Sequence, residues 1–238
     1  PGPVLNENIV QGCVNLGWGN VRVADELSAL TGLKVKAAND ANVAALGEQW
    51  QGGGKGFQNL VMFTLGTGVG GGIIQNGRII SGANGAAGEI GHMTVNPGDT
   101  QPCSCGKRGC LEQYASAGGI VRLAQAAGLR VESAKDVSDL AAWGNERAQG
   151  ALKKAGRLLG LALSNAACLV DVDGILLGGG VAAAVVEAIK HIDPSREIQI
   201  EYGDGLRECR KMLQMARAGK RNGYLLEGMA CPGGCLAG

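Results

Sequence analysis

The chain has 238 residues, of which 45% are hydrophobic and 18% charged, so it can bury one large or two modest cores and is not a disordered protein. The net charge of +1 comes from scattered lysines and arginines, which excludes a basic footprint for nucleic acid. No apolar run approaches the ~20 residues that span a bilayer, and the first residues do not have the charged-then-apolar pattern of a leader, so we expect a soluble, cytoplasmic protein that does not bind membranes.

The first fifty residues predict two helices separated by a short strand. Residues 1–21, rich in proline, glycine and asparagine, should form turns and extended chain. Residues 23–33 have the apolar spacing of an amphipathic helix, and Gly32 should end it. The apolar positions of this helix are Val23, Leu27, Leu30 and Leu33. Residues 34–38 then predict a strand that leads into a second helix at Asp40.

Asp40 is a candidate ligand-binding residue because it lies where a strand should become a helix, a common place for ligand contact in an α/β sheet. The alternative is that Asp40 is only the N-cap of the second helix, as many aspartates are. The residues by themselves leave both roles open.

Residues 60–80 predict strands joined by tight turns. Asn76-Gly77 between apolar runs indicates a hairpin. The segment GTGVGGG, residues 66–72, offers backbone N–H groups and the Thr67 hydroxyl to an anion. It matches neither a Walker loop nor a dinucleotide fingerprint, so on its own it is weak evidence for phosphate binding.

The stretch from Glu89 to Glu112 has the composition of a site. Three thiolates and one imidazole suit a four-coordinate structural zinc, and nearby glycines would let the chain fold back around a metal. A disulfide and free buried thiols are the alternatives. The candidate ligands are His92, Cys103, Cys105 and Cys110.

The next elements predict an α/β protein. A helix should run from about Glu112 to Ala127, and a long helix from about Asn145 to Val170. Cys168 in the long helix is expected to be a small buried residue. Residues 174–180, GILLGGG, predict a buried strand ending in a glycine turn, typical of an α/β nucleotide site.

From about Ala182 the sequence predicts a small αβαβ unit. His191, near the end of its first helix, is more typical of a favourable charge at a helix terminus than of a ligand. The positive charges of its second helix are those of a solvated face.

The motifs NDAN, TLGTGVGGGI, GANGAAGEIGHMTV and CSCGKRGCLE together resemble the ROK family of sugar kinases and sugar-responsive repressors, over about residues 1–181. The resemblance implies an α/β fold of the actin-like, hexokinase-like (ribonuclease H-like) type, in which a large lobe carries a structural zinc loop. It also implies transfer of a phosphoryl group to a hexose from ATP, with Mg²⁺ accompanying the nucleotide.

The resemblance also assigns roles to individual residues. Asp40 would be the general base on the sugar hydroxyl, and Asn39 would hold the sugar beside it. Other hydroxyls would bond to Glu89, His92 and Glu112. One ring nitrogen of His92 would do this while the other joins the three cysteines on Zn²⁺. The residues implied to contact ATP are Gly66, Thr67, Gly68, Gly70, Gly178 and Gly179.

Two departures from the family accompany the resemblance. The family's Asp-x-Gly-x-Thr phosphate turn, in an N-terminal lobe, is not in this sequence, so we expect an incomplete lobe with little ATP turnover. Residues 182–238 resemble the C-terminal part of FeFe hydrogenases, whose matching cysteines, here Cys231 and Cys235, ligate an iron–sulfur cluster. The other cysteine motifs of that cluster are missing, so no complete iron–sulfur site is expected. The junction falls between Gly178 and Val185.

Three functional hypotheses follow. The first is a kinase lobe that binds glucose or a related hexose and ATP, with assembly into a homo-oligomer left open. The second is a sugar-sensing repressor domain, since ROK repressors keep the same sugar and zinc residues. The third, more remote, is an iron–sulfur fragment of a hydrogenase. Asp40 and the GTGVGGG segment favour the kinase.

Overall fold

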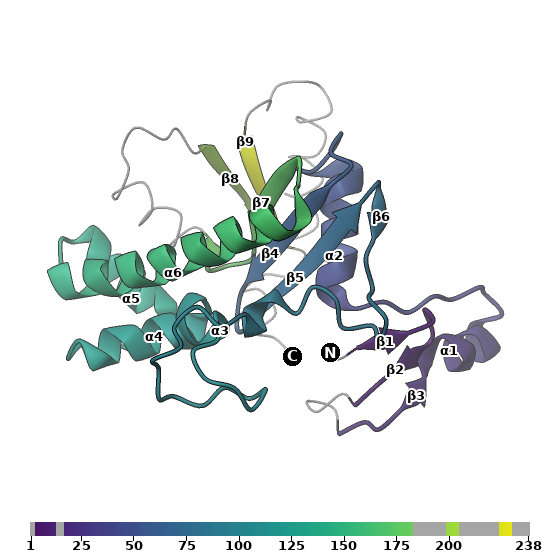
Figure 1. Ribbon diagram of the computed structural model, residues 1–238, viewed down its shortest axis with the longest axis horizontal. Helices are drawn as coiled ribbons and strands as arrows, with labels where there is room; N and C mark the ends of the chain where they lie inside the picture. The colour runs from purple at the N-terminus through teal and green to yellow at the C-terminus, as the bar shows by residue number, and fades with distance from the viewer. Residues whose placement is uncertain (1–2, 13–16, 183–198, 205–223, 230–238) are drawn as a thin grey trace.

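A mixed four-stranded sheet lies at the centre of the described residues (Figure 1). The computed structural model describes residues 3–12 and 17–182 and the strands 199–204 and 224–229. The sheet has the order β6-β5-β4-β7; β4 and β7 are parallel, and the other pairs are antiparallel. Its strands are β4 (Leu60–Leu65), β5 (Val69–Gln75), β6 (Arg78–Ile79) and β7 (Gly174–Gly178).

The β5–β6 hairpin is formed where Asn-Gly predicted it. Asn76 and Gly77 have φ of 51° and 71°, the left-handed values that a two-residue hairpin turn requires and that asparagine and glycine adopt most readily. The β4–β5 hairpin instead turns through Gly66–Gly68, with Leu65 opposite Val69. The predicted strands of residues 60–80 and the strand of residues 174–178 are therefore confirmed.

Helices cover both faces of the sheet (Figure 1). Side chains alternate along β4: Val61, Phe63 and Leu65 belong to the core formed with the C-terminal helices. Leu60 and Met62 belong to a smaller core on the face of α2 (Asp40–Gln51). The C-terminal helices are α3 (Glu112–Ala115), α4 (Ala117–Ala126), α5 (Ala134–Ala142) and α6 (Glu146–Val170).

The C-terminal helices differ from the prediction at three points. The expected helix of residues 112–127 is broken into α3 and α4 at Ser116, and α5 was not expected. The long helix is confirmed as α6, with Asn145 as its N-cap. The expectation that Cys168 is buried is wrong, because Cys168 lies on an exposed face of α6.

The N-terminal residues form a small separate layer. The strands β1 (Val4–Leu5), β2 (Ile9–Val10) and β3 (Val21–Arg22) pair antiparallel, and α1 (Val23–Thr31) follows and ends at Gly32 as predicted. The predicted strand of residues 34–38 is not formed. Only the Ala37 N–H in this segment bonds to neighbouring backbone, at 2.8 Å from the Glu7 oxygen, and a strand needs a continuous ladder of such bonds.

Two further strands, β8 (Gln199–Asp204) and β9 (Tyr224–Met229), pair in parallel, and β9 contacts β7. In the sequence, β8 and β9 overlap the two strands predicted for the αβαβ unit. The predicted helices of that unit, His191, Cys231 and Cys235 lie outside the described residues. Among the helices that the structure describes, none has the length and apolar character needed to cross a lipid bilayer.

Candidate active site and metal cluster

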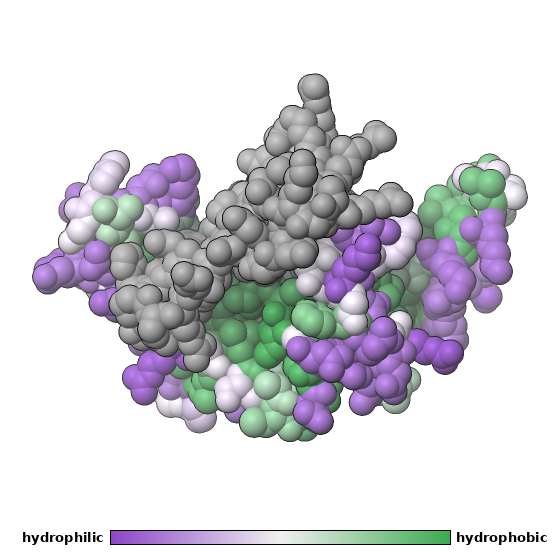
Figure 2. Space-filling model, turned by 90° about the horizontal axis from the view of Figure 1, so that it is seen from above, coloured by the Kyte–Doolittle hydropathy of each residue, from purple (hydrophilic) through white to green (hydrophobic). Residues whose placement is uncertain are grey.

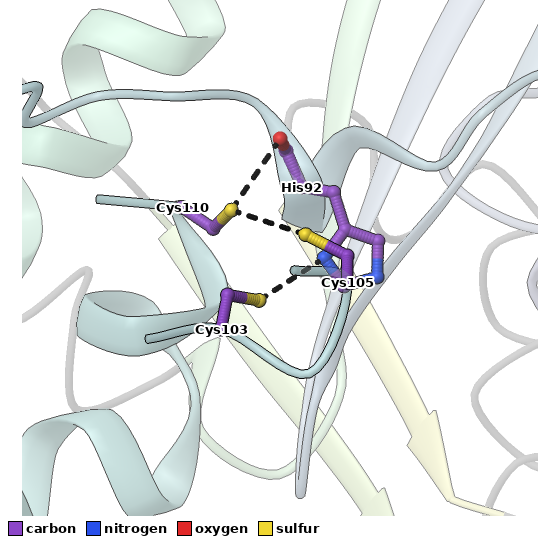
Figure 3. Close-up of side chains that lie close together, drawn as sticks. All are labelled: His92, Cys103, Cys105 and Cys110. Atoms are coloured by element: carbon purple, nitrogen blue, oxygen red, sulfur yellow. Dashed lines mark hydrogen bonds between the residues drawn. The ribbon is translucent and has the colours of Figure 1, made fainter. Parts of the chain in front are cut away.

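Four candidate metal ligands come together in one cluster (Figure 3). One ligand atom from each of the four lies within 4.8 Å of every other. His92 ends the short 3₁₀ turn η2 (Ile90–His92), and the cysteines follow on one loop. Cys103 and Cys110 are buried, and Cys105 is exposed at the rim.

The loop folds back on itself through local backbone bonds. The Cys103 N–H donates to the Lys107 oxygen at 2.8 Å, closing a turn that carries Cys105. Gly109 has a φ of 68°, and a Cβ there would lie 1.9 Å from the Asn96 oxygen, so no other residue fits. The Lys107 ammonium donates to the His92 carbonyl at 2.8 Å, which joins the loop to the residue that carries the imidazole.

The distances within the cluster fit a tetrahedral metal better than a disulfide. Cys103 Sγ lies 3.5 Å from His92 Nδ1, and Cys105 Sγ lies 3.6 Å from Cys110 Sγ. Tetrahedral bonds of ~2.3 Å to sulfur and ~2.05 Å to nitrogen place such pairs about 3.6 Å and about 3.8 Å apart. A disulfide would need sulfurs ~2.05 Å apart. The described cysteines are accordingly free thiols.

The pKa values of two thiols in the cluster, Cys103 and Cys110, are shifted in opposite directions. Burial, the largest influence on Cys103, raises its pKa, but hydrogen bonds from the Cys105 backbone and from the neighbouring Cys and His side chains outweigh burial and lower the pKa to about 6. Burial, followed by the neighbouring thiols, raises the pKa of Cys110 to about 12. One thiolate therefore forms readily, and the last forms only when a cation offsets the accumulated charge.

A polar network not foreseen in the sequence supports the metal loop from α3 and α4. The Tyr114 hydroxyl donates to Asp99 and accepts from Asn96 Nδ2 at 2.8 Å. Arg122 donates to Asp99 at 3.3 Å and to the Gln113 oxygen at 2.7 Å. Burial tends to raise the pKa of Asp99, but these donors and the Arg122 charge hold it below its usual value. The bonds that join Asp99 to Tyr114 and to Arg122 span 15 and 23 positions, beyond the reach of local sequence patterns.

The start of α2 separates the two roles that the sequence left open for Asp40. Asn39 is the N-cap: its Oδ1 accepts from the Ala41 N–H at 2.9 Å and from the Asn42 N–H at 3.3 Å. The interpretation of Asp40 as the cap is therefore wrong. Asp40 is the first helical residue, and its carboxylate is exposed beside the capped N-terminus.

The segments that carry the candidate residues converge on the first residues of β5. On one face, a Cβ at Gly70 would lie 3.2 Å from Ala41 Cβ, next to Asp40. Near the same end of the strand, a Cβ at Gly91, between Glu89 and His92, would lie 2.0 Å from the Val69 oxygen. Glycine at both positions lets α2 and η2 approach the strand closely.

Glu112 reaches the same point from the C-terminal helices. The Val69 N–H donates to Glu112 Oε2 at 3.1 Å. Glu112 lines a cavity of about 460 Å³ together with Thr67, Gly68 and Ser116. The lining of this cavity does not include Asn39, Asp40, Glu89 or His92, so Glu112 shares a cavity with residues of the Gly66–Gly68 turn and the other four candidates do not.

The two glycine turns expected to contact ATP, Gly66–Gly68 and Gly178–Gly179, follow the carboxyl ends of neighbouring strands. β4 and β7 are parallel, so Leu65 and Gly178 end neighbouring strands at the same side. Gly179 has a φ of 94°, and a Cβ there would lie 2.4 Å from the Leu65 oxygen. The Gly66–Gly68 turn, with Thr67 exposed at its tip, leaves the sheet from Leu65 and is therefore next to the Gly178–Gly179 turn.

Comparison with known proteins places this architecture in a family. The model of the ROK family matches residues 1–196, and the chain belongs to that family. The match continues past Val181, where the sequence suggested a junction; the hydrogenase-like character of the last residues stays a prediction.

The relatives include kinases and a regulator. The chain is 42% identical over 202 residues to the glucokinase of Halalkalibacterium halodurans, covering 79% of this chain and 61% of that protein. It resembles the structure of a ROK family glucokinase from Streptomyces griseus in complex with glucose and AMPPNP, with a TM-score of 0.69, 33% identity and coverage of 80% and 67%. A ROK family transcriptional regulator, a homologue of the E. coli MLC protein, matches with a TM-score of 0.70, 26% identity and coverage of 96% and 56%.

The solved structures bear out the α/β, hexokinase-like fold expected from the sequence. The chain spans 61% of the length of the Halalkalibacterium halodurans glucokinase.

Proposed function

We propose that this chain carries the sugar-contacting and phosphate-contacting lobe of an ATP-dependent hexose kinase, with glucose or a related sugar as acceptor. One observation carries the proposal. The start of the Asp40 helix, the Glu89–His92 segment and Glu112 all contact the first residues of β5, which directly follow the Gly66–Gly68 turn. The similarity to a glucokinase that binds glucose and AMPPNP supports the same conclusion.

Asp40 is the proposed general base. A sugar hydroxyl is a poor nucleophile, so a carboxylate within hydrogen-bond reach takes its proton as the γ-phosphoryl group arrives in line. Asn39 is the N-cap of α2, and Asp40 Oδ1 also accepts from the Ala41 N–H, at 2.9 Å. The Nδ2 group of Asn39, which cannot act in capping, is a hydrogen-bond donor for a sugar oxygen beside the base.

Glu89, His92 and Glu112 are proposed to bind the other sugar hydroxyls. A neutral polyol offers no charge to grip, so its recognition depends on polar groups that the wrong sugar leaves unpaired. His92 presents Nδ1 to the cysteine cluster, which leaves Nε2 for a sugar hydroxyl. Glu112 presents a carboxylate to the cavity beside the Gly66–Gly68 turn.

Zn²⁺ is the proposed metal of the cluster formed by His92, Cys103, Cys105 and Cys110. The donor set and the near-tetrahedral spacing fit a structural zinc with no open coordination position. The bound metal would fix His92 and, through Cys110, the start of α3. His92 and Glu112 then hold their orientation because the loop between them is closed.

ATP, with its Mg²⁺, is proposed to bind at the edge where the two glycine turns meet. The Gly66–Gly68 turn and Gly70 face the phosphates with backbone N–H groups and the Thr67 hydroxyl. Gly178 and Gly179, at the end of β7, would line the adenosine side.

The decisive experiment compares wild type with Asp40→Asn. Hexose affinity is measured by calorimetry on the chain itself, and turnover is measured after fusion to a ROK N-terminal lobe with its phosphate turn. We expect kcat to fall at least about a hundredfold, because an amide cannot take the proton. The hexose Kd should change far less, since the other contacts remain. A fall in kcat of less than about tenfold, or parallel loss of affinity, contradicts the assignment of the base.

A sugar-sensing role is the second candidate, favoured by the likeness to the ROK regulator. A sensor needs the sugar residues and the metal loop but no base. Hexose binding without turnover in the fused protein, unchanged by Asp40→Asn, would favour the sensor over the kinase.

A further inference from the structure

Glu112 makes a contact that sugar binding alone does not require. Its Oε2 accepts a hydrogen bond from the Val69 N–H at 3.1 Å, and Val69 directly follows the Gly66–Gly68 turn. A Cβ at Gly68 would lie 2.6 Å from the same oxygen, so glycine is needed there for the carboxylate to come this close. The φ of Gly68 is not in the left-handed region, so this requirement is one of space and not of backbone conformation.

Hydrogen bonds fix the main chain around Glu112. Leu111 is fully buried, and its N–H donates to the Met93 oxygen at 2.9 Å. The Glu112 carbonyl accepts from the Ser116 hydroxyl at 2.6 Å. The following residue, Ala117, donates its N–H to the Gly66 oxygen at 2.9 Å. The junction of α3 and α4 therefore ties both ends of the Gly66–Gly68 turn.

The second oxygen of the carboxylate remains available for a ligand. Oε2 bonds to Val69, while Glu112 also lines the cavity that Thr67 and Gly68 share. A carboxylate accepts at both oxygens, so a hydroxyl donor in the cavity can bond to Oε1 without breaking the Val69 contact. Such a hydroxyl would fix the orientation of the carboxylate. Through the bond to Val69, it would also fix the Gly66–Gly68 turn.

We propose that Glu112 is a positioning residue that couples hexose binding to nucleotide binding through the Val69 amide. The inference rests on the proposed function, because it takes the hexose and ATP as the two ligands. A hexose hydroxyl orders the Glu112 carboxylate, the carboxylate orders the Gly66–Gly68 turn, and the ordered turn binds the nucleotide phosphates more tightly. By linkage, the nucleotide tightens hexose binding by the same factor.

The first test measures the affinity of the chain for the Mg²⁺ complex of AMPPNP with and without saturating glucose. We expect glucose to lower the nucleotide Kd at least about fivefold in the wild type, and less than about twofold in Glu112→Ala. Nucleotide Kd values that are equal with and without glucose, when both ligands bind, would overturn the coupling. Failure of the chain to bind either ligand would instead contradict the proposed function, together with the coupling built on it.

The second test needs no ligand and is a double-mutant cycle on the thermal midpoint. Gly68→Ala should push the carboxylate away from Val69 and lower the midpoint by roughly 2–6 °C. The same substitution should cost much less in the Glu112→Ala background, where no carboxylate is displaced. Gly66→Ala is the matched control, because a Cβ at Gly66 meets no atom within 4 Å.

Additive effects of Gly68→Ala and Glu112→Ala would show that the two positions do not communicate, and would overturn the positioning role whatever the ligands do. Amide hydrogen exchange gives a direct check, since the Val69 amide should exchange faster in Glu112→Ala. An unchanged Val69 exchange rate in that variant would also count against the proposal.

Discussion

Two neighbouring side chains at the start of α2 have different roles: Asn39 caps the helix, and Asp40 is its first residue. Asparagine and aspartate are both good N-caps, so residue type could not say whether position 39 or 40 would cap the helix. The backbone decides: Asn39 has the extended conformation of a cap, with φ of −63° and ψ of 141°, and Asp40 is already helical. The Asp40 carboxylate accepts from the Ala41 N–H at 2.9 Å, inside the first turn of the helix.

Glu48 on α2 provides a pH-dependent prediction. Its burial raises its pKa, which the Gly53 N–H, donating at 2.9 Å, offsets only in part. A raised folded-state pKa gives stability that is present below the unfolded pKa of ~4.3 and is lost as the pH rises through the folded pKa. We therefore expect the thermal midpoint of Glu48→Gln, relative to wild type, to be higher at pH 7 than at pH 4.

Glu26→Gln is the control for Glu48→Gln, because Glu26 is an exposed glutamate of α1. Its midpoint relative to wild type should change little between the two pH values. A Glu48→Gln variant that follows the Glu26→Gln variant across the pH range would contradict the role of burial. Thermal unfolding followed by circular dichroism is sufficient for the comparison.

The metal cluster predicts about one zinc per chain in protein purified under reducing conditions. Cys105→Ser removes one of four ligands, so zinc content and thermal midpoint should both fall, because structural zinc is linked to folding. Cys168→Ser is the matched control, since Cys168 is a free, exposed cysteine on α6. Equal zinc content in the two variants, measured by atomic spectrometry, would rule out the cluster as the zinc site.

At the element scale, Ser116 turns one predicted helix into two. Its backbone has the extended conformation of an N-cap, and its hydroxyl accepts from the Gly119 N–H at 3.0 Å while donating to Glu112. The break has a consequence for the site, because a continuous helix could not place the Ala117 N–H on the Gly66 oxygen.

Replacement of Ser116 by alanine should lower the free energy of unfolding by about 1–2 kcal/mol, since a buried cap and a second hydrogen bond are lost together. Ser133→Ala, which removes the exposed cap of α5, should cost less because water can replace the lost group. Urea denaturation measures both. A smaller loss for Ser116→Ala than for Ser133→Ala would contradict the importance of the break.

At the scale of the whole molecule, burial is concentrated on the sheet and its helices. In β4, all residues except Thr64 are buried, whereas in α1, which lies wholly within the described residues, Ala24 is the one buried residue. Leu30 in α1 and Leu33 just beyond it, both on the apolar face predicted for residues 23–33, are 82% and 68% exposed. The end of the molecule that carries α1 shows apolar surface among hydrophilic side chains (Figure 2).

Uneven burial predicts uneven local stability. Amides of α1 should exchange with solvent at least roughly a hundredfold faster than those of β4, because few apolar contacts oppose local opening. Helix α2, which packs on the sheet, is the internal control and should exchange more slowly than α1. Native-state hydrogen exchange measures all three elements in one sample. Equal protection of α1 and β4 would show that the N-terminal layer is stabilised in some other way.

Features with local physical causes could be predicted from the sequence. The Asn76-Gly77 turn follows from which residues tolerate left-handed backbone, and α6 from apolar spacing and its cap. The metal cluster could be predicted because all four ligands lie within nineteen residues and are rare types with few other uses. The family could be predicted from motifs for the same reason.

Features that depend on distant partners could not be predicted from the sequence and became visible in the folded chain. Residues 34–38 have strand-like sequence but too few backbone partners to form a ladder, and Cys168 lies on an exposed face although its residue type is usually buried. The bond between Glu112 and Val69 joins positions 43 residues apart and exists because the α3–α4 junction packs onto the hairpin tip. Such contacts carry no local signal, since each requires the rest of the chain to have folded around it.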